Sequence, residues 1–307
     1  MKKLTILICT LAMVATGALP AKAVDVAPSI VVIDTGTDPA FFGSKIVAEA
    51  CFVEYYSCPN GKLTMEGPGA SFIPPTTNEA LNHGTQMLSI VNKVNPAANL
   101  IPIRIVGINA KGLPGLYTLA SVKQALDWVI ANQAKYNIAV VSLSQGGIKA
   151  NCNVPAGMVA QFATLRAKNV PVITAVGNDG SKTDSNSPAC IPDAVAIGAT
   201  DNPEPTSRPI AWDPKASPYI ARYNNVSSFV DFYANGRWFA TNRDGSVKFK
   251  VGSSTATASV AGWWLLNRKE SFDATYKYLS DNAGTAKNEW FTGKYIFIDS
   301  LTMGTGK

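Results

Sequence analysis

Short runs of β-branched and aliphatic residues alternate with helical patterns along most of this chain of 307 residues. Strands that alternate with helices predict an α/β fold, with a mostly parallel, doubly wound sheet and helices on both faces. We expect strands at residues 30–33, 46–53, 101–106, 138–143, 170–176 and 194–197, a loop over 58–82, and helices from residue 83 onward, over 119–130 and over 158–165.

Polar side chains follow three of these predicted strands. Asp34, Ser144 and Asn178 each lie just past the end of a strand. Ligands of open α/β sheets bind outside the carboxyl ends of the strands. The three side chains are therefore expected to meet at one edge of the sheet, where a functional site would form.

The N-terminus has the pattern of a bacterial secretory signal peptide. Lys2 and Lys3 precede an apolar stretch from Leu4 to about Leu19, and residues 21–23 read Ala-Lys-Ala, a cleavage site of the A-x-A type. The stretch is short for a membrane span, so we expect cleavage after residue 23 rather than a stable membrane anchor. The mature chain, residues 24–307, would be secreted or periplasmic and long enough for one large domain.

The charge of the chain gives no sign of a polyanionic partner. The 27 Lys and Arg residues exceed the 21 Asp and Glu residues by six, and loss of residues 1–23 removes three lysines. An excess of about three does not predict binding of nucleic acid or of an anionic membrane. No loop is dense in metal ligands, so we assign no metal and no cofactor, and we expect a monomer.

Four cysteines follow residue 23, and an even number in an oxidising compartment predicts two disulfides. Three pairings are possible. The sequence favours Cys51 with Cys58, which closes a short loop, and Cys152 with Cys190, which would connect two loops near the predicted site. The alternative is that the thiols are free and buried.

His83 is the only histidine in the sequence. A helix is expected to begin there, because Met87, Ile90, Val91 and Val94 recur at helical spacing after it. Any chemistry that needs an imidazole base near neutral pH must use His83.

Asp34, His83 and Ser254 supply the three groups of a catalytic triad. A serine hydroxyl is a poor nucleophile at its own pKa, so it needs a nearby base, and that base needs a third group to fix its tautomer. The chain order of carboxylate, imidazole and hydroxyl is one of the orders known for such triads. Ser254 also opens a segment of small residues that we expect to be helical, which would direct backbone N–H groups toward a developing oxyanion.

In five ordered blocks the chain resembles the subtilases, the subtilisin-like serine proteases. The blocks are VVIDTG at 31–36, HGT at 83–85, SLSQGG at 142–147, VITAVGNDG at 172–180, and GSS at 252–254 with the small residues up to Gly262. The similarity extends from about Ser29 to the C-terminal helix. It implies a subtilisin-like fold and a secreted serine endopeptidase that cleaves proteins or peptides through an acyl-enzyme.

The resemblance also implies residue roles. Asp34 would orient His83, His83 would take the proton of Ser254, and Asn178 would donate to the oxyanion. Residues 112–115 would pair with an extended peptide. The pocket for the side chain before the scissile bond would have two walls of mainly small residues with room for a large apolar group, namely Ser144, Gln145 and Gly146 on one side and Ala175, Val176 and Gly177 on the other.

The sequence departs from the family pattern without losing a triad member. Gln86 stands where the family usually has a second histidine, Ser253 replaces a threonine, and Ala258 and Ser259 replace a proline and a histidine. Only residues 24–33 separate the expected cleavage site from Asp34, so no propeptide of domain size is expected there. Folding would then proceed unaided or with a separate assistant.

Two other functions remain open. The first is a secreted binding protein on the same fold that has lost catalysis, which the altered serine block permits and the intact triad argues against. Each triad residue taken alone also fits a strand end, a helix start or a helix cap. The second is a serine esterase of the α/β-hydrolase type. The chain order argues against the esterase, and so does the lack of a G-x-S-x-G motif. The motif is missing because Ala256, and not glycine, follows Thr255.

Overall fold

The structure is a computed structural model that describes residues 27–298, except residues 76, 149–151, 185, 202–217 and 227. The expected signal peptide lies outside the described residues. Within the described part, none of the helices is both long and apolar enough to span a membrane.

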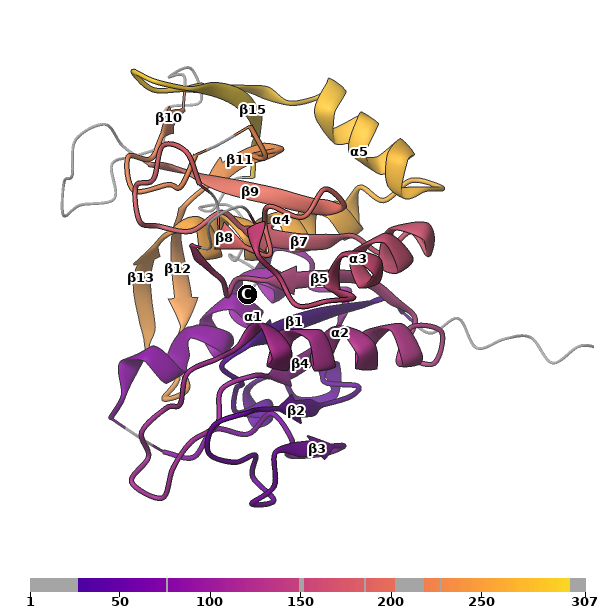
Figure 1. The fold of residues 1–307 in the computed structure, drawn as a ribbon, viewed down its shortest axis with the longest axis vertical. Helices are drawn as coiled ribbons and strands as arrows, with labels where there is room; N and C mark the ends of the chain where they lie inside the picture. The colour runs from indigo at the N-terminus through magenta and orange to yellow at the C-terminus, as the bar shows by residue number, and fades with distance from the viewer. Residues whose placement is uncertain are drawn as a thin grey trace, which may run out of the picture.

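An eleven-stranded sheet forms the centre of the molecule (Figure 1). In spatial order the strands are β10 (Tyr219–Ile220), β14 (Gly284–Lys287), β15 (Thr292–Ile296), β11 (Phe232–Asn235), β9 (Ala194–Asp201), β7 (Val172–Ala175), β5 (Ile138–Leu143), β1 (Ser29–Asp34), β4 (Asn99–Arg104), β2 (Ala50–Phe52) and β3 (Thr64–Glu66). In this spatial order all neighbours from β15 to β2 are parallel, and antiparallel pairings occur between β2 and β3, between β14 and β15, and between β9 and β10. The predicted mostly parallel sheet is therefore confirmed.

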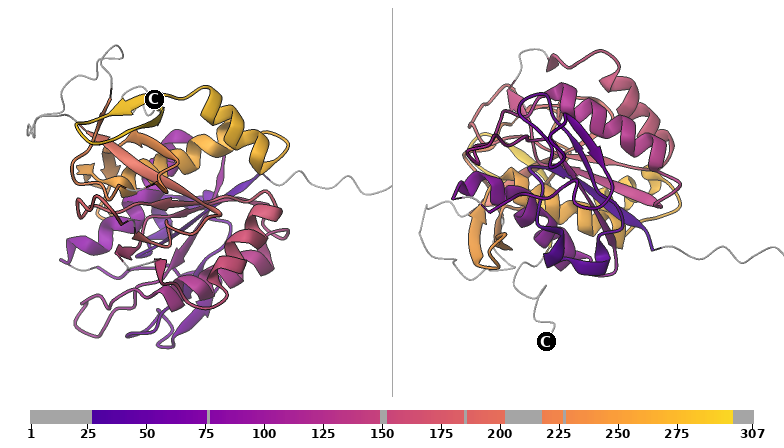
Figure 2. Two further views of the ribbon diagram at one scale, coloured as in Figure 1. Left: turned by 45° about the horizontal axis from the view of Figure 1, so that its top comes forward. Right: turned by 90° about the horizontal axis from the view of Figure 1, so that it is seen from below.

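Helices cover both faces of this sheet (Figure 2), as predicted. Successive side chains of a strand point to opposite faces. Ile30 and Val32 of β1 therefore pack with one set of helices, and Val31 and Ile33 pack with the other. The first face carries α1 (His83–Val94), α4 (Ser253–Leu266) and α5 (Phe272–Asp281), and the second carries α2 (Leu119–Asn132) and α3 (Met158–Ala167).

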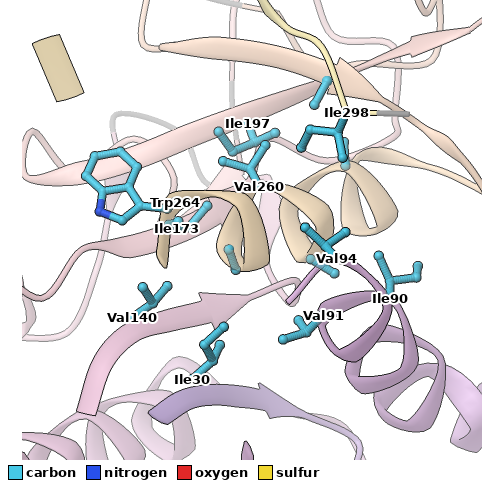
Figure 3. Packing of buried hydrophobic residues seen from close by; sticks show 14 of the residues in the cluster. Ile30, Ile90, Val91, Val94, Val140, Ile173, Ile197, Val260, Trp264 and Ile298 are labelled. Atoms are coloured by element: carbon cyan, nitrogen blue, oxygen red, sulfur yellow. The ribbon is translucent and has the colours of Figure 1, made fainter. Parts of the chain in front are cut away.

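Helix α4 lies in the centre of the larger core cluster (Figure 3). Apolar side chains from β1, α1 and the strands beyond β5 converge on it, and its own Val260 and Trp264 are almost completely buried. A helix that is buried on nearly all sides needs small and apolar residues all round. This explains the run of Ala, Ser, Thr and Gly around Ser254, and it fixes the start of α4 firmly against the sheet.

Two small ribbons complete the fold. β12 (Arg237–Thr241) and β13 (Val247–Val251) form a hairpin that leads directly into α4, and β6 (Gly147–Ile148) pairs with β8 (Asn186–Ser187). Short 3-10 helices occupy Pro39–Phe41, Gly43–Lys45 and Glu79–Asn82. The extended stretch predicted at 46–53 is a strand only at 50–52, and the loop predicted over 58–82 contains β3 and a 3-10 turn.

Both disulfides have the pairing that the sequence favours. Cys51 is bonded to Cys58, and Cys152 is bonded to Cys190. The second disulfide joins the segment after β6 to the segment after β8. It therefore reinforces the β6–β8 ribbon.

The strand order changes direction at β1. After β1 the chain builds β2, β3 and β4 on one side of it, and then places β5, β7 and β9 on the other side. Loops that leave the carboxyl ends of β1 and its neighbours diverge at such a point and form a crevice. Asp34, the last residue of β1, lies at this position.

Candidate active site

A cleft of about 640 Å³ lies beside the carboxyl ends of β1, β5 and β7. It brings together residues that are far apart in the sequence. Those from the predicted site are His83, Ser144, Gln145, Gly146, Ala175, Gly177, Asn178 and Ser254.

His83, which lines this cleft, is in direct contact with Asp34. The Nδ1 atom of His83 lies 2.8 Å from Oδ1 and 2.9 Å from Oδ2 of Asp34. The carboxylate is 1% exposed, whereas the imidazole is 28% exposed. Because a carboxylate can only accept hydrogen bonds, Nδ1 of His83 must carry the proton. Nε2 of the neutral ring is then free to act as a base.

The first turn of α1 holds His83 in this position. The helix begins at His83, as predicted, and the backbone N–H of Gly84 donates to Oγ1 of Thr35 (2.9 Å). The backbone N–H of Thr35 in turn donates to Oδ1 of Asp34 (2.7 Å). These two hydrogen bonds connect the end of β1 to the start of α1.

The pKa of His83 is raised above its ordinary value of 6.5. Burial is the largest single influence and lowers the pKa, because it disfavours the charged ring. The charge of Asp34 and the hydrogen bond to it act together in the opposite direction and outweigh burial, while the charge of Lys250 lowers the pKa slightly. The imidazolium that forms when His83 accepts a proton is thus stabilised by its partner.

Ser254 lies in the second position of α4 and, like His83, lines the cleft. Its Oγ donates to the backbone carbonyl of Ser144 (3.3 Å), and Ser144 Oγ donates to the carbonyl of Ser254 (3.2 Å). No hydrogen bond joins Ser254 to His83 in the described part of the chain. The structure therefore brings the hydroxyl and the imidazole to one cleft with the hydroxyl turned toward Ser144.

Asn178 faces the start of α4. Its Oδ1 accepts from the backbone N–H of Ser253 (2.8 Å), which fixes the orientation of the amide. Its Nδ2 group has no hydrogen-bond partner among the described residues, and an ideal Cβ on Gly252 would lie 3.4 Å from it. A carboxamide donor is thus available beside the N-terminal turn that carries Ser254.

Five of the six predicted wall residues line the cleft, and Val176 does not. Its side chain is fully buried in a small cluster with Ala189 and Ala196, so the placement of Val176 in the substrate pocket is wrong. Adjacent residues of an extended segment point in opposite directions, so Ala175 and Val176 cannot both face the cleft. Of the predicted peptide-pairing segment at 112–115, Pro114 and Gly115 line the cleft.

The departures from the family pattern have partners in this structure. The Nε2 group of Gln86 donates to Oδ1 of Asn242 (2.7 Å) in the turn of the β12–β13 hairpin. The Oγ of Ser253 accepts from the backbone N–H of Gly177 (3.2 Å), which connects α4 to the segment that carries Asn178. Ala258 and Ser259 are fully buried within α4.

Four polar residues of the cleft were not predicted from the sequence, namely Glu79, Tyr117, Asn186 and Lys250. Lys250 lies four residues before Ser254, on the strand that leads into α4, so its closeness in sequence was a signal. Glu79 and Asn186 belong to segments whose place beside the cleft follows only from the tertiary fold.

The chain is similar in sequence to known serine proteases. The model of the subtilase family matches residues 27–277. Similar proteins include a cuticle-degrading serine protease of Orbilia oligospora, 25% identical over 72% of this chain and 48% of its own length. An extracellular serine proteinase of Thermus sp. (strain Rt41A) is 27% identical over 64% of this chain and 44% of its own. The chain thus spans less than half the length of these relatives.

Solved structures share the fold. A cold-adapted subtilisin-like serine proteinase superposes with a TM-score of 0.61 at 21% identity, covering 89% of this chain and 88% of that one. The prenylagaramide maturation protease PagA gives a TM-score of 0.57 at 16% identity, covering 85% of this chain and 84% of that one.

Proposed function

Because this chain belongs to the subtilase family, we propose that it is a serine endopeptidase in which Asp34, His83 and Ser254 form the catalytic triad. The observation that carries the proposal is the contact between the buried carboxylate of Asp34 and the partly exposed imidazole of His83, in the cleft that Ser254 also lines. A histidine that only begins a helix would not need a buried carboxylate as the hydrogen-bond partner of its ring.

The proposed reaction begins with the Ser254 hydroxyl. Rotation about its Cα–Cβ bond would exchange the hydrogen bond to Ser144 for one to Nε2 of His83. His83 would then take the proton as Ser254 attacks a peptide carbonyl, and would return it to the leaving amine. Asp34 holds the tautomer and stabilises the imidazolium, and water completes the cycle by hydrolysing the acyl-enzyme.

Two kinds of donor would stabilise the oxyanion. The first turn of α4 contributes backbone N–H groups and the positive end of the helix dipole, and Asn178 contributes its Nδ2 group. In subtilisin, a member of this family, loss of one such side-chain donor costs about 2.7 to 4 kcal/mol of transition-state stabilisation. We expect an effect of similar size for Asn178.

The shape of the cleft fits a segment of extended polypeptide. Pro114 and Gly115 form one edge, and Ser144, Gly146 and Ala175 lie on the walls with little side-chain bulk. We expect the pocket before the scissile bond to accept a large apolar side chain. The same proposal includes export, with cleavage after Ala23 releasing a mature chain that begins at Val24.

A fluorophosphonate probe tests the nucleophile directly. The probe should label the purified protein at Ser254, as identified by peptide mapping, and the protein should cleave casein. Ser254→Ala should lose both labelling and cleavage, whereas Ser144→Ala, which removes the neighbouring hydroxyl of the same cleft, should keep the labelling.

Two results would contradict the proposal. Absence of labelling in folded protein would favour the alternative of a binding protein that has lost catalysis. Labelling at Ser254 with no cleavage of casein or of a peptide library, but with turnover of simple esters, would favour an esterase. Neither alternative has a specific structural observation in its favour.

A further inference from the structure

We propose that Gln145 is a positioning residue that holds Asp34 in place and adjusts His83 as a base, an inference that rests on the proposed function. The Nε2 group of Gln145 lies 3.1 Å from Oδ1 of Asp34 and 3.1 Å from Nδ1 of His83. Although the family resemblance implies only a wall of the substrate pocket for Gln145, its amide reaches behind the imidazole to the acid of the triad.

The chemistry of the contact fixes the orientation of the amide. An ionised carboxylate can only accept hydrogen bonds, so the NH₂ group of Gln145 must face Asp34. The opposite orientation would bring the carbonyl oxygen of Gln145 against the carboxylate. Because Nδ1 of His83 already donates to Asp34, the amide and the imidazole are two donors that share one acceptor atom.

Oδ1 of Asp34 therefore accepts from three groups on three elements. These are the backbone N–H of Thr35 after β1 (2.7 Å), Nδ1 of His83 on α1 (2.8 Å), and Nε2 of Gln145 after β5 (3.1 Å). Asp34 is 1% exposed, so bulk water does not easily replace a lost donor. A buried acceptor that loses a partner is destabilised, and hydrogen bonds to charged groups are the stronger kind.

Gln145 also acts on His83 through its charge distribution. The positive end of the amide dipole lies near Nδ1 and opposes protonation of the ring. The hydrogen bond from the amide to Asp34 also weakens the attraction between the carboxylate and the imidazolium. The charged groups around His83 are Asp34 from β1, Lys250 from β13, Glu79 from the turn before α1, and Asp179 from the segment after β7. A change at residue 145 leaves all four in place.

The sole histidine allows a direct measurement. In a Ser254→Ala background, which prevents self-digestion, the pKa of His83 can be followed by NMR in protein purified without a histidine tag. Gln145→Met preserves the length of the side chain and removes the donor. It should raise the pKa of His83 on the order of half a pH unit, because one group opposing the imidazolium is lost.

Kinetics provide a second readout in protein that carries Ser254. Gln145→Met should lower kcat about tenfold, the equivalent of one hydrogen bond of roughly 1.4 kcal/mol to a charged group. KM for a short peptide should change less, because the contact made by Nε2 is to the triad. Gln133→Met is the matched control: it removes an amide hydrogen bond, to the carbonyl of Ile138, at the far end of α2, and should leave kcat and the pKa of His83 unchanged.

A second variant keeps the test decisive if Gln145→Met folds poorly. Gln145→Leu also removes the donor, and it should raise the pKa of His83 by a similar amount, because the same group opposing the imidazolium is lost. An unchanged pKa of His83 in both folded variants would overturn the inference, whether or not the protein cleaves peptides. A raised pKa in protein that cleaves nothing would support the contact while contradicting the proposed function, so the two failures are distinguishable.

Discussion

The proposed base is one imidazole whose proton equilibrium is governed by its neighbours. Burial lowers the pKa of His83, Asp34 raises it by more, and Lys250 lowers it slightly, so the net displacement is upward from 6.5. Catalysis needs the neutral ring, because only then can Nε2 accept a proton. Hydrolysis should therefore increase with pH and reach half of its maximum above pH 6.5.

The measurement is kcat/KM for a neutral peptide across roughly pH 5 to 9 at constant ionic strength. A peptide without titrating groups is needed so that the profile reports on the free enzyme. Since the sequence holds no other histidine, the acidic limb can be assigned to His83 and compared with its NMR titration. A flat profile between about pH 5 and pH 8 would contradict the role of His83 as the base.

The residues of the site were predictable where chemistry restricts the choice. His83 was identified because the chain has no second imidazole, and Asp34, Ser144 and Asn178 because each follows a strand end at one edge of the sheet. The prediction for Val176 was wrong because side chains alternate in direction near the end of β7, so Val176 points away from the cleft that Ala175 lines. The contact of Gln145 with Asp34 leaves no pattern in the sequence, since it depends on the path of the chain after β5.

At the level of elements, the site depends on how closely α1 approaches the end of β1. An ideal Cβ on Gly84 would lie 2.2 Å from the carbonyl oxygen of Gly36 and 2.9 Å from its nitrogen. Both are backbone atoms that cannot move aside easily. Only glycine at position 84 therefore lets α1 lie close enough to the end of β1 for His83 to contact Asp34.

Gly84→Ala should move the first turn of α1 away from β1. We expect a loss of roughly 2 to 3 kcal/mol in the free energy of unfolding, as for other overpacked sites. Displacement of His83 by about 1 Å should also reduce kcat/KM by up to about 10²-fold. Chemical denaturation and peptide hydrolysis measure the two effects.

Gly284→Ala on β14 is a suitable control, because the nearest atom to its Cβ would lie 3.8 Å away, an ordinary contact. It should change stability by less than about 0.5 kcal/mol and leave hydrolysis unaffected. If Gly84→Ala were equally mild, the close approach of α1 to β1 would not be the feature that positions His83.

Six strands of the central sheet were predictable from apolar runs, namely β1, β2, β4, β5, β7 and β9, and α1, α2 and α3 were predictable from their helical patterns. The short strands β3, β10, β11, β14 and β15 were not predicted. The β12–β13 hairpin was not predicted, although Asp244-Gly245 between two alternating segments is typical of such a turn. The hydrogen bonds between this hairpin and α1 were therefore not predicted either. Ser89 Oγ accepts from the backbone N–H of Thr241, and Lys93 donates to the carbonyl of Phe239.

At the scale of the whole molecule, the two disulfides differ in how much chain they close. Cys51 and Cys58 are separated by 7 residues, and Cys152 and Cys190 by 38. A crosslink reduces the conformational entropy of the unfolded chain more when the loop is longer. Replacement of Cys152 and Cys190 by serine should lower the free energy of unfolding by about 4 kcal/mol, against about 2 kcal/mol for Cys51 and Cys58. Urea denaturation of both double variants at one pH compares them.

The two double variants should also differ in activity. The disulfide of Cys152 and Cys190 reinforces the ribbon of β6 and β8, and both Gly146 and Asn186, which line the cleft, adjoin or belong to that ribbon. Without this disulfide the wall would be less well ordered, so KM for a peptide substrate should rise while the pKa of His83 stays the same. Loss of Cys51 and Cys58, at the edge of the sheet, should leave KM unchanged. Equal effects of the two replacements on KM would mean that the β6–β8 wall is held by its backbone pairing alone, and that the longer disulfide contributes to stability without shaping the cleft.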